Sequence, residues 1–274
     1  MHYRSVTAIV VSFSVLAASP LIADDTDALF EALGMPEILE VMRVEGIEYG
    51  AQIGTDLFPA RTNASWAATV ETIYDASTML DRVKGDFAAS LEGDDVPAML
   101  AYFTTEPGRS FAGLEISARR ALLDDAVDAA SKDMALIAAQ DQSARYKQVE
   151  RFVQVNDLVE TNVVGALNSN FAFYKGLMAG GGFGGALTED QILSDVWDQE
   201  PDIRANTNEW VYSFLLLAYD PVSDADMESY IAFSQTAAGV QLNATLFDAF
   251  DAMFDDISFT LGREAARMMS GAEL

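Results

Sequence analysis

The chain has 274 residues, which is long enough to bury a core without covalent cross-links, and it contains no cysteine and a single histidine. Its 43 acidic residues outnumber 16 basic ones, giving a formal net charge of −27 at pH 7. This charge argues against nucleic acid or anionic lipid as a partner, because both are bound mainly through Lys and Arg.

Residues 1–23 have the pattern of a secretory signal peptide. Arg4 supplies a positive charge, residues 6–18 are apolar apart from hydroxyl side chains, and Ala23 is a small residue suited to cleavage before Asp24. The apolar run is shorter than the roughly twenty residues that a membrane-spanning helix needs. We therefore expect the leader to be removed, leaving a periplasmic protein. The absence of cysteine also excludes a lipid anchor on that residue.

Cleavage would also remove His2, the only histidine. The mature chain would then lack the side chains for Cys-His or Ser-His-Asp catalysis, for His/Cys zinc sites and for haem ligation by histidine. Carboxylate chemistry, a Ser-Lys pair or no chemistry remain, and we expect no cofactor.

Apolar spacing is helical almost throughout and predicts an all-α protein, a multi-helix array or bundle. Asp25 or Thr26 should cap a short helix that ends at Gly34, and Pro36 should open a longer one. Residues 58–63 are expected to be a connector. The expected buried positions of the longer helix are Leu39, Met42, Gly46, Tyr49 and Ile53.

A third helix should follow and stop in a turn at 93–95, where Asp95 would cap the next element. Its expected buried positions are Trp66, Val70, Ile73, Leu80 and Phe87.

No Gly or Pro occurs between Leu114 and Val164, so long helices are expected there. We predict a break near 141–143, with Ser143 as the cap of a new helix, and a continuous helix is the alternative. The apolar stripe beyond it is formed by Phe152, Val155, Val159, Val163, Ala166, Phe173 and Leu177.

The glycine-rich stretch 180–185 has no preceding strand and no following Gly-Lys-Ser/Thr, so it is interpreted as a loop between helices and not as a phosphate cradle. A capping box at 188–191 should restart the helix. The next helix should end at 220–221, and the run 211–219 is too short to span a membrane. Its expected buried face is Ile203, Thr207, Trp210, Phe214 and Leu217.

Residues 95–125 align without a gap on 226–256, with identical residues at eight positions and a matching apolar register. We interpret this as two copies of one helical unit, 24–142 and 143–274. Each would hold a helix, a turn and a second helix. In the first copy Pro107 should force a break, whereas the second copy lacks the proline and the helix is free to continue through 237–239. The second helix of the second copy has the stripe Leu242, Leu246, Ala249, Phe250, Met253 and Ile257.

The stretch LAYFTTEPGRSF at 100–111 resembles the aromatic, Ser/Thr, Pro and Gly signature of the DUF2059 family. The segment 29–46 is similar to the opening of those proteins, and 231–242 is similar to a second, degenerate copy. This resemblance implies an all-α periplasmic domain of unknown function and brings no catalytic residues. The residues that carry the motif are Tyr102, Thr105, Pro107 and Gly108 in the first copy and Phe233, Thr236 and Gly239 in the second.

Two adjacent aspartate pairs recur in both units, Asp124 with Asp125 and Asp255 with Asp256. They raise the hypotheses of an acid pair and of a calcium-binding patch. Adjacent residues on a helix point about 100° apart, so a site would need one carboxylate from each unit. The simpler interpretation is a solvated helix face, or ion pairs with Arg119, Arg120 or Arg263.

Glu115 lies in the apolar stripe of the first copy and could be a buried carboxyl with a raised pKa, although an ion pair with Arg119 one turn on is the simpler account. The segment Asp224-x-Asp226-x-Glu228 superficially matches a calcium loop, but helix capping explains it better. Several asparagines indicate either a polar groove or a buried amide that fixes helix register. They are Asn156, Asn162, Asn168, Asn170, Asn206 and Asn208.

We therefore expect a non-enzymatic binding or interaction protein of the cell envelope, which holds a partner protein, peptide or envelope component in a groove between the units. The alternatives are a carboxylate-dependent hydrolase of cell-wall glycan and an acidic cation-binding protein. The hydrolase would need two carboxylates about 5 to 10 Å apart in one cleft, one of them desolvated. The oligomeric state stays open.

Overall fold

The computed structural model describes residues 20–58, 64–91, 95–182 and 188–271, with side chains from residue 25 onward. These ranges are helical and contain no strand, which confirms the all-α prediction. The helices are α1 (Pro20–Ala32), α2 (Met35–Leu57), α3 (Ala64–Ile73), α4 (Ala76–Ser90), α5 (Val96–Phe103), α6 (Gly108–Ala121), α7 (Asp125–Asp141), α8 (Ala144–Val155), α9 (Leu158–Ala179), α10 (Glu189–Trp197), α11 (Glu200–Tyr219), α12 (Asp224–Ser234) and α13 (Ala237–Ser270).

Several sequence predictions fall wholly or partly outside the described ranges. They are the signal peptide up to residue 19, the connector at 59–63, the start of the turn at 93–95 and most of the glycine-rich loop. Because α1 begins at Pro20, the expected cleavage after Ala23 falls in its first turn. Among the helices of the described ranges, none combines the length and apolarity that crossing a bilayer requires.

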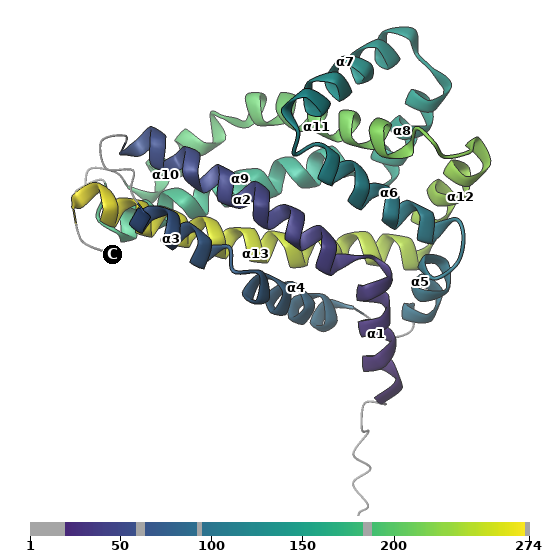
Figure 1. Cartoon of the computed structure of the whole chain (residues 1–274), viewed down its shortest axis with the longest axis horizontal. Helices are drawn as coiled ribbons and strands as arrows, with labels where there is room; N and C mark the ends of the chain where they lie inside the picture. The colour runs from purple at the N-terminus through teal and green to yellow at the C-terminus, as the bar shows by residue number, and fades with distance from the viewer. Residues whose placement is uncertain (1–19, 59–63, 92–94, 183–187, 272–274) are drawn as a thin grey trace, which may run out of the picture.

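Helices α9 and α13 pack side by side along the length of the molecule (Figure 1). They run in the same direction, because Asn156 beside the start of α9 contacts Asn243 early in α13, whereas Gly180 at the end of α9 meets Arg263. The two long helices thus form the spine on which the other elements are placed.

The spine helices touch backbone to backbone near their carboxyl ends. A Cβ atom added to Gly176 would lie 2.0 Å from the carbonyl oxygen of Phe259. Reciprocally, one added to Gly262 would lie 2.0 Å from the carbonyl oxygen of Phe173. No side chain fits in that space, so glycine is required on both helices.

Within the described ranges the buried apolar side chains form two large hydrophobic cores and a smaller one between α9 and α10. The main core joins α1–α5 to the spine helices, and Phe30, Trp66, Phe87 and Leu261 are among its fully buried side chains. The second core joins α6, α7, α8, α11 and α12 around Tyr219. The main core draws on both predicted units, so their interiors are shared.

Two of the predicted helix starts are confirmed. Ser143 caps α8, its hydroxyl oxygen accepting from the backbone N–H of Tyr146 at 3.1 Å, after Gln142 ends α7 in the left-handed region. The capping box at the start of α10 is present in both directions, since Thr188 accepts from the Gln191 N–H and its own N–H donates to the Gln191 side chain.

Other predicted boundaries were wrong. The expected third helix is divided, because the Asp75 carboxylate accepts from the Thr78 N–H at 2.9 Å and starts α4. The apolar stripe from Phe152 to Leu177 crosses a break, since Asp157 has a φ of 50° and separates α8 from α9. Asp95 stands at the start of α5, but its side chain makes no capping hydrogen bond.

The repeated segments each contain a helix, a turn and a second helix at matching positions. α5 ends at Phe103 and α12 at the aligned Ser234. The second copy does not continue through 237–239 as expected, because the hydroxyl oxygen of Thr236 accepts from the Gly239 N–H at 3.1 Å and starts a new helix. The copies then differ, since α6 ends at Ala121 whereas α13 continues to Ser270. The two-unit repeat therefore stays a prediction.

Half of the positions predicted in the apolar stripes are buried, and all of the others except Tyr49 are partly buried. Tyr49 is 53 % exposed, unlike the other expected positions of its helix. In α11 the buried face is Val211, Leu215 and Tyr219, within the run 211–219, whereas the predicted Trp210 and Phe214 are only partly buried. The reason is that the latter two face a groove.

Candidate ligand-binding groove

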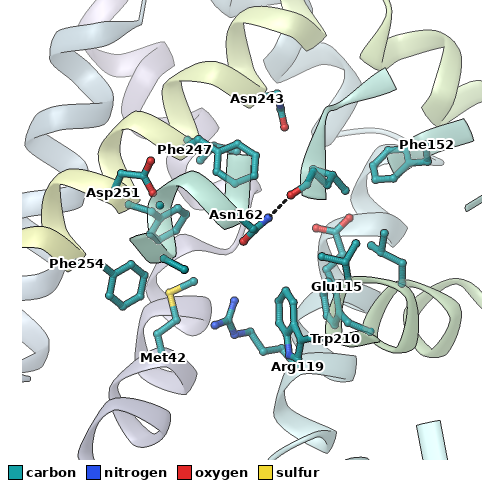
Figure 2. A pocket seen from close by; sticks show the side chains of 18 of the residues that line it. Met42, Glu115, Arg119, Phe152, Asn162, Trp210, Asn243, Phe247, Asp251 and Phe254 are labelled. Atoms are coloured by element: carbon teal, nitrogen blue, oxygen red, sulfur yellow. Dashed lines mark hydrogen bonds between the residues drawn. The ribbon is translucent and has the colours of Figure 1, made fainter. Parts of the chain in front are cut away.

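A groove of about 480 Å³ opens between α9, α11 and α13, where the two large cores meet. Eight of the 21 described residues that line it are aromatic. In Figure 2 Phe152, Trp210, Phe247 and Phe254 lie around Asn162, together with the polar groups of Glu115, Arg119 and Asp251. The aromatic lining residues are Phe152, Trp210, Phe214, Tyr219, Tyr230, Phe247, Phe250 and Phe254.

Glu115 of α6 brings a carboxyl group to one end of this groove. Its Oε1 accepts hydrogen bonds from the hydroxyls of Tyr219 at 2.7 Å and Tyr230 at 3.2 Å. Burial raises the pKa of Glu115, while the two tyrosine donors partly offset that increase. Burial and the Glu115 charge together raise the pKa of both tyrosines well above their ordinary value.

The predicted pairing of Glu115 with Arg119 is wrong. Arg119 instead forms a bidentate ion pair with Glu45 of α2, with nitrogen–oxygen distances of 2.8 and 3.1 Å. Its guanidinium group also lies 5.5 Å from the ring centroid of Trp210. Because Arg119 is held by these partners, Glu115 has no compensating cation within the described ranges, where its hydrogen-bond donors are the hydroxyls of Tyr219 and Tyr230.

Asp251 of α13 is a second carboxyl group in the groove wall. Burial is the main reason why its pKa rises to about 6, and repulsion from Asp255 and Asp248 adds to the effect. In Figure 2 Asp251 lies at the end away from Glu115, with Phe247 and Asn162 between them. The groove therefore holds two carboxyls that both bind a proton more readily than usual.

Two asparagines complete the polar lining. The Asn162 side chain donates to the carbonyl oxygen of Leu158 at 2.7 Å (Figure 2). Asn243 donates to the carbonyl oxygen of Asn156 at 3.0 Å and so links α13 to the α8–α9 turn. Asn162 thus lines a groove, as one alternative for the asparagine set predicted, whereas Asn156 is buried and donates to the Phe152 carbonyl one turn earlier in the chain.

The other predicted asparagines lie elsewhere. Asn170 donates to Gln199 at 3.3 Å, Asn208 donates to the Arg204 carbonyl oxygen, and Asn168 and Asn206 are exposed.

The repeated aspartates have separate structural roles. Asp124 caps α7 by accepting from the Ala126 N–H at 2.9 Å, and Asp125 is exposed in the first turn of α7. Asp255 accepts from the Ser169 hydroxyl at 3.4 Å, and burial raises its pKa. Asp256 forms an ion pair with Arg82 of α4. Their expected partners are engaged differently, since Arg119 binds Glu45 and Arg263 binds Glu264.

Within the described ranges, no group of three acidic side chains is placed to hold a metal ion. In the segment compared with a calcium loop, Ser223 caps α12 and binds Asp226, while Glu228 pairs with Arg151. The segment thus opens a helix as predicted, but the cap is Ser223, the residue before it.

The motif residues of the two aligned segments contact each other. The rings of Tyr102 and Phe233 stack with a centroid distance of 4.1 Å and an interplanar angle of 11°. Gly108 lies against the carbonyl oxygen of Tyr102 and Gly239 against that of Phe233, so the same close contact occurs twice. Pro107 precedes α6, but Thr105 donates to the Ala101 carbonyl and caps no helix, unlike Thr236.

Neither Asp251 nor the tyrosine partners of Glu115 are predicted from the sequence. Tyr219 and Tyr230 are 104 and 115 residues away from Glu115 in the chain, so no local pattern connects them. Asp251 does have a local signal, because Phe247 and Phe254 lie one turn away on either side of it.

Comparisons of this chain with models of protein families, with curated protein sequences and with solved structures found no match. The DUF2059 resemblance therefore stays a prediction from the motif alone.

Proposed function

We propose that this chain is a non-enzymatic binding protein of the periplasm, and that its groove receives the apolar body of a small amphiphilic envelope component. The observation that carries the proposal is the open groove, lined mainly by apolar side chains of which eight are aromatic, at the junction of the two large cores. Its volume of about 480 Å³ lies in the usual range of small-molecule sites, roughly 300 to 1,000 Å³.

The lining explains why such a ligand would be favoured. Trp210 and Phe214 stack with centroids 5.3 Å apart and are both only partly buried, so a ligand can cover apolar surface that water now contacts. Leu246 and Phe250 of α13 are partly buried across from them. Covering such surface supplies affinity, and the few polar groups supply orientation.

Binding of N-phenyl-1-naphthylamine, a neutral apolar fluorophore, tests this proposal. The probe should accept energy from Trp210, and a Trp210→Phe variant should lose most of that transfer. Trp197→Phe is the control, because Trp197 is 65 % exposed and does not line the groove. Failure of the wild-type protein to bind the probe would contradict the proposal.

A substitution that fills the groove with a larger side chain tests the same proposal by its effect on probe affinity. Ala166 lines the groove from α9, so Ala166→Phe should lower probe affinity by about tenfold or more. Asn168→Phe is the matched control, because Asn168 is exposed on the same helix and lies outside the lining. Circular dichroism should show that both variants keep the helical fold. Equal binding by the two variants would place the probe elsewhere.

Export is tested by the amino terminus of the protein recovered from the periplasmic fraction. We expect it to begin at Asp24, and we expect a charged substitution such as Ala23→Asp to prevent cleavage. Recovery of the uncleaved chain in the cytoplasm would contradict the periplasmic assignment.

A carboxylate-dependent hydrolase of cell-wall glycan is the second candidate, because Glu115 and Asp251 both line the groove and burial raises the pKa of each. Incubation with purified peptidoglycan should then release soluble sugars. Loss of that release in Glu115→Gln, with normal probe binding, would favour the hydrolase.

A further inference from the structure

The Asp251 carboxyl has no partner of opposite charge within the described part of the chain, although it lies in the groove wall. A Cβ atom on Gly165 would lie 2.6 Å from Asp251 Oδ1, so glycine at this position leaves room for the carboxylate beside α9. Phe247 and Phe254 line the groove one turn away on either side of it (Figure 2). A carboxylate between aromatic faces attracts an ammonium group through both charge and the ring quadrupole.

The surrounding charges strengthen this preference. Asp248 and Asp255 lie on the same helix as Asp251, and the facing α9 contributes only neutral groups there, Gly165 and Ser169. Among the described lining residues Arg119 is the single base, and it is occupied by Glu45 and Trp210.

The net charge of the whole chain, −27, repels an anionic head group and attracts a cationic one over a longer range. The groove is thus complementary to a cation with an apolar body.

We infer that the groove selects a cationic amphiphile, whose apolar body lies among the aromatic side chains and whose protonated amine or quaternary ammonium group binds Asp251. This inference rests on the proposed function and specifies its ligand class. An anionic amphiphile of the same length would place its charge against Asp251, Asp248 and Asp255, and a neutral one would leave Asp251 unpaired.

Displacement of N-phenyl-1-naphthylamine at pH 8.0 and at 0.15 M salt tests the inference. The competitors are octyltrimethylammonium, octanol and octyl sulfate, used below concentrations that form micelles. We expect the ammonium compound to displace the probe at about tenfold lower concentration than the sulfate, since attraction replaces repulsion at one partly buried charge.

Two asparagine variants separate the site from the general acidity of the protein. Asp251→Asn should retain probe binding and lose most of the preference for the cation. Asp248→Asn removes the same charge one turn away, at an exposed position outside the groove lining, and should keep the preference.

Each result has a distinct meaning. No probe binding by the wild-type protein overturns the proposed function, and the inference with it. Probe binding with equal displacement by all three competitors overturns the inference alone. An equal loss of preference in both variants also overturns it, because the selectivity would then come from the overall charge.

Discussion

Replacing Asp251 by asparagine should stabilise the protein at neutral pH. Burial, with repulsion from Asp255 and Asp248, raises the pKa of Asp251 to about 6, against 3.8 for an ordinary aspartate. Because the pKa is higher in the folded state, the folded chain holds this proton more tightly than the unfolded chain. The stability contributed by this group is therefore complete below pH 3.8 and lost as the pH rises through about 6.

The size of the effect follows from that difference in pKa. Each pH unit of such a difference corresponds to about 1.4 kcal/mol, so the gap between 3.8 and about 6 sets an upper limit of about 3 kcal/mol. Asp251 is only partly buried, and water screens its charge, which reduces the expected gain in unfolding free energy to about 1 kcal/mol. For a chain of this size that gain corresponds to a rise in Tm of about 2 to 4 °C.

Thermal unfolding of Asp251→Asn and of the wild-type protein, followed by circular dichroism, measures this gain. It should be largest at pH 7.5 and about half as large at pH 5.0, where the folded protein already holds the proton. Asp133→Asn on the exposed face of α7 is the control and should show no comparable dependence on pH. A lower Tm for Asp251→Asn at pH 7.5, or a gain that stays constant with pH, would refute the reasoning.

Two further predictions concern packing and the buried Glu115. Gly176→Ala should lower the unfolding free energy by on the order of 3 kcal/mol, because its methyl group would collide with the backbone of α13. Chemical denaturation measures this loss. Tyr219→Phe should cost about 1 to 2 kcal/mol at pH 7.5, because it removes the shorter hydrogen bond to Glu115 and raises the pKa of that carboxyl further. The cost should shrink toward pH 4.5, where a protonated Glu115 needs less stabilisation.

Controls for both exist in the same chain. Gly85 has open space around its Cβ position, so Gly85→Ala should leave the protein as stable or add about 1 kcal/mol. Tyr212 is partly buried on the same helix as Tyr219 but has no contact with Glu115, and Tyr212→Phe should show no comparable dependence on pH. If Gly176→Ala were as stable as Gly85→Ala, the prediction that α9 and α13 touch at Gly176 would be refuted.

The sequence was most informative where structure is local. Ser143 and Thr188 cap helices because their hydroxyl oxygens accept from the backbone N–H three residues later. Such caps can be predicted from the sequence without knowledge of the fold. The Asp75 carboxylate caps α4 in the same way, accepting from the Ser77 hydroxyl and the Thr78 N–H. The break before α4 is therefore predictable from local sequence, because Asp75 precedes Ser77 and Thr78 in a capping pattern.

The groove was harder to foresee, because apolar periodicity reports which residues avoid water and not what covers them. Trp210, Phe214 and Phe250 were all expected in buried stripes, and all three line the open groove instead. The raised pKa of Glu115 was foreseen as a hypothesis, yet its partner was not, since i,i+4 spacing favoured Arg119 over tyrosines more than a hundred residues away.

The glycine contact between α9 and α13 also bears on how wide the groove can become. Its walls are built from the first half of α9 and the middle of α13, while Gly176 and Gly262 join the same two helices farther along. Because the backbones of α9 and α13 are in contact there, any separation of the two helices must be larger at the groove than at this contact. The close contact at Gly176 and Gly262 therefore limits how far the α9 and α13 walls of the groove can move apart.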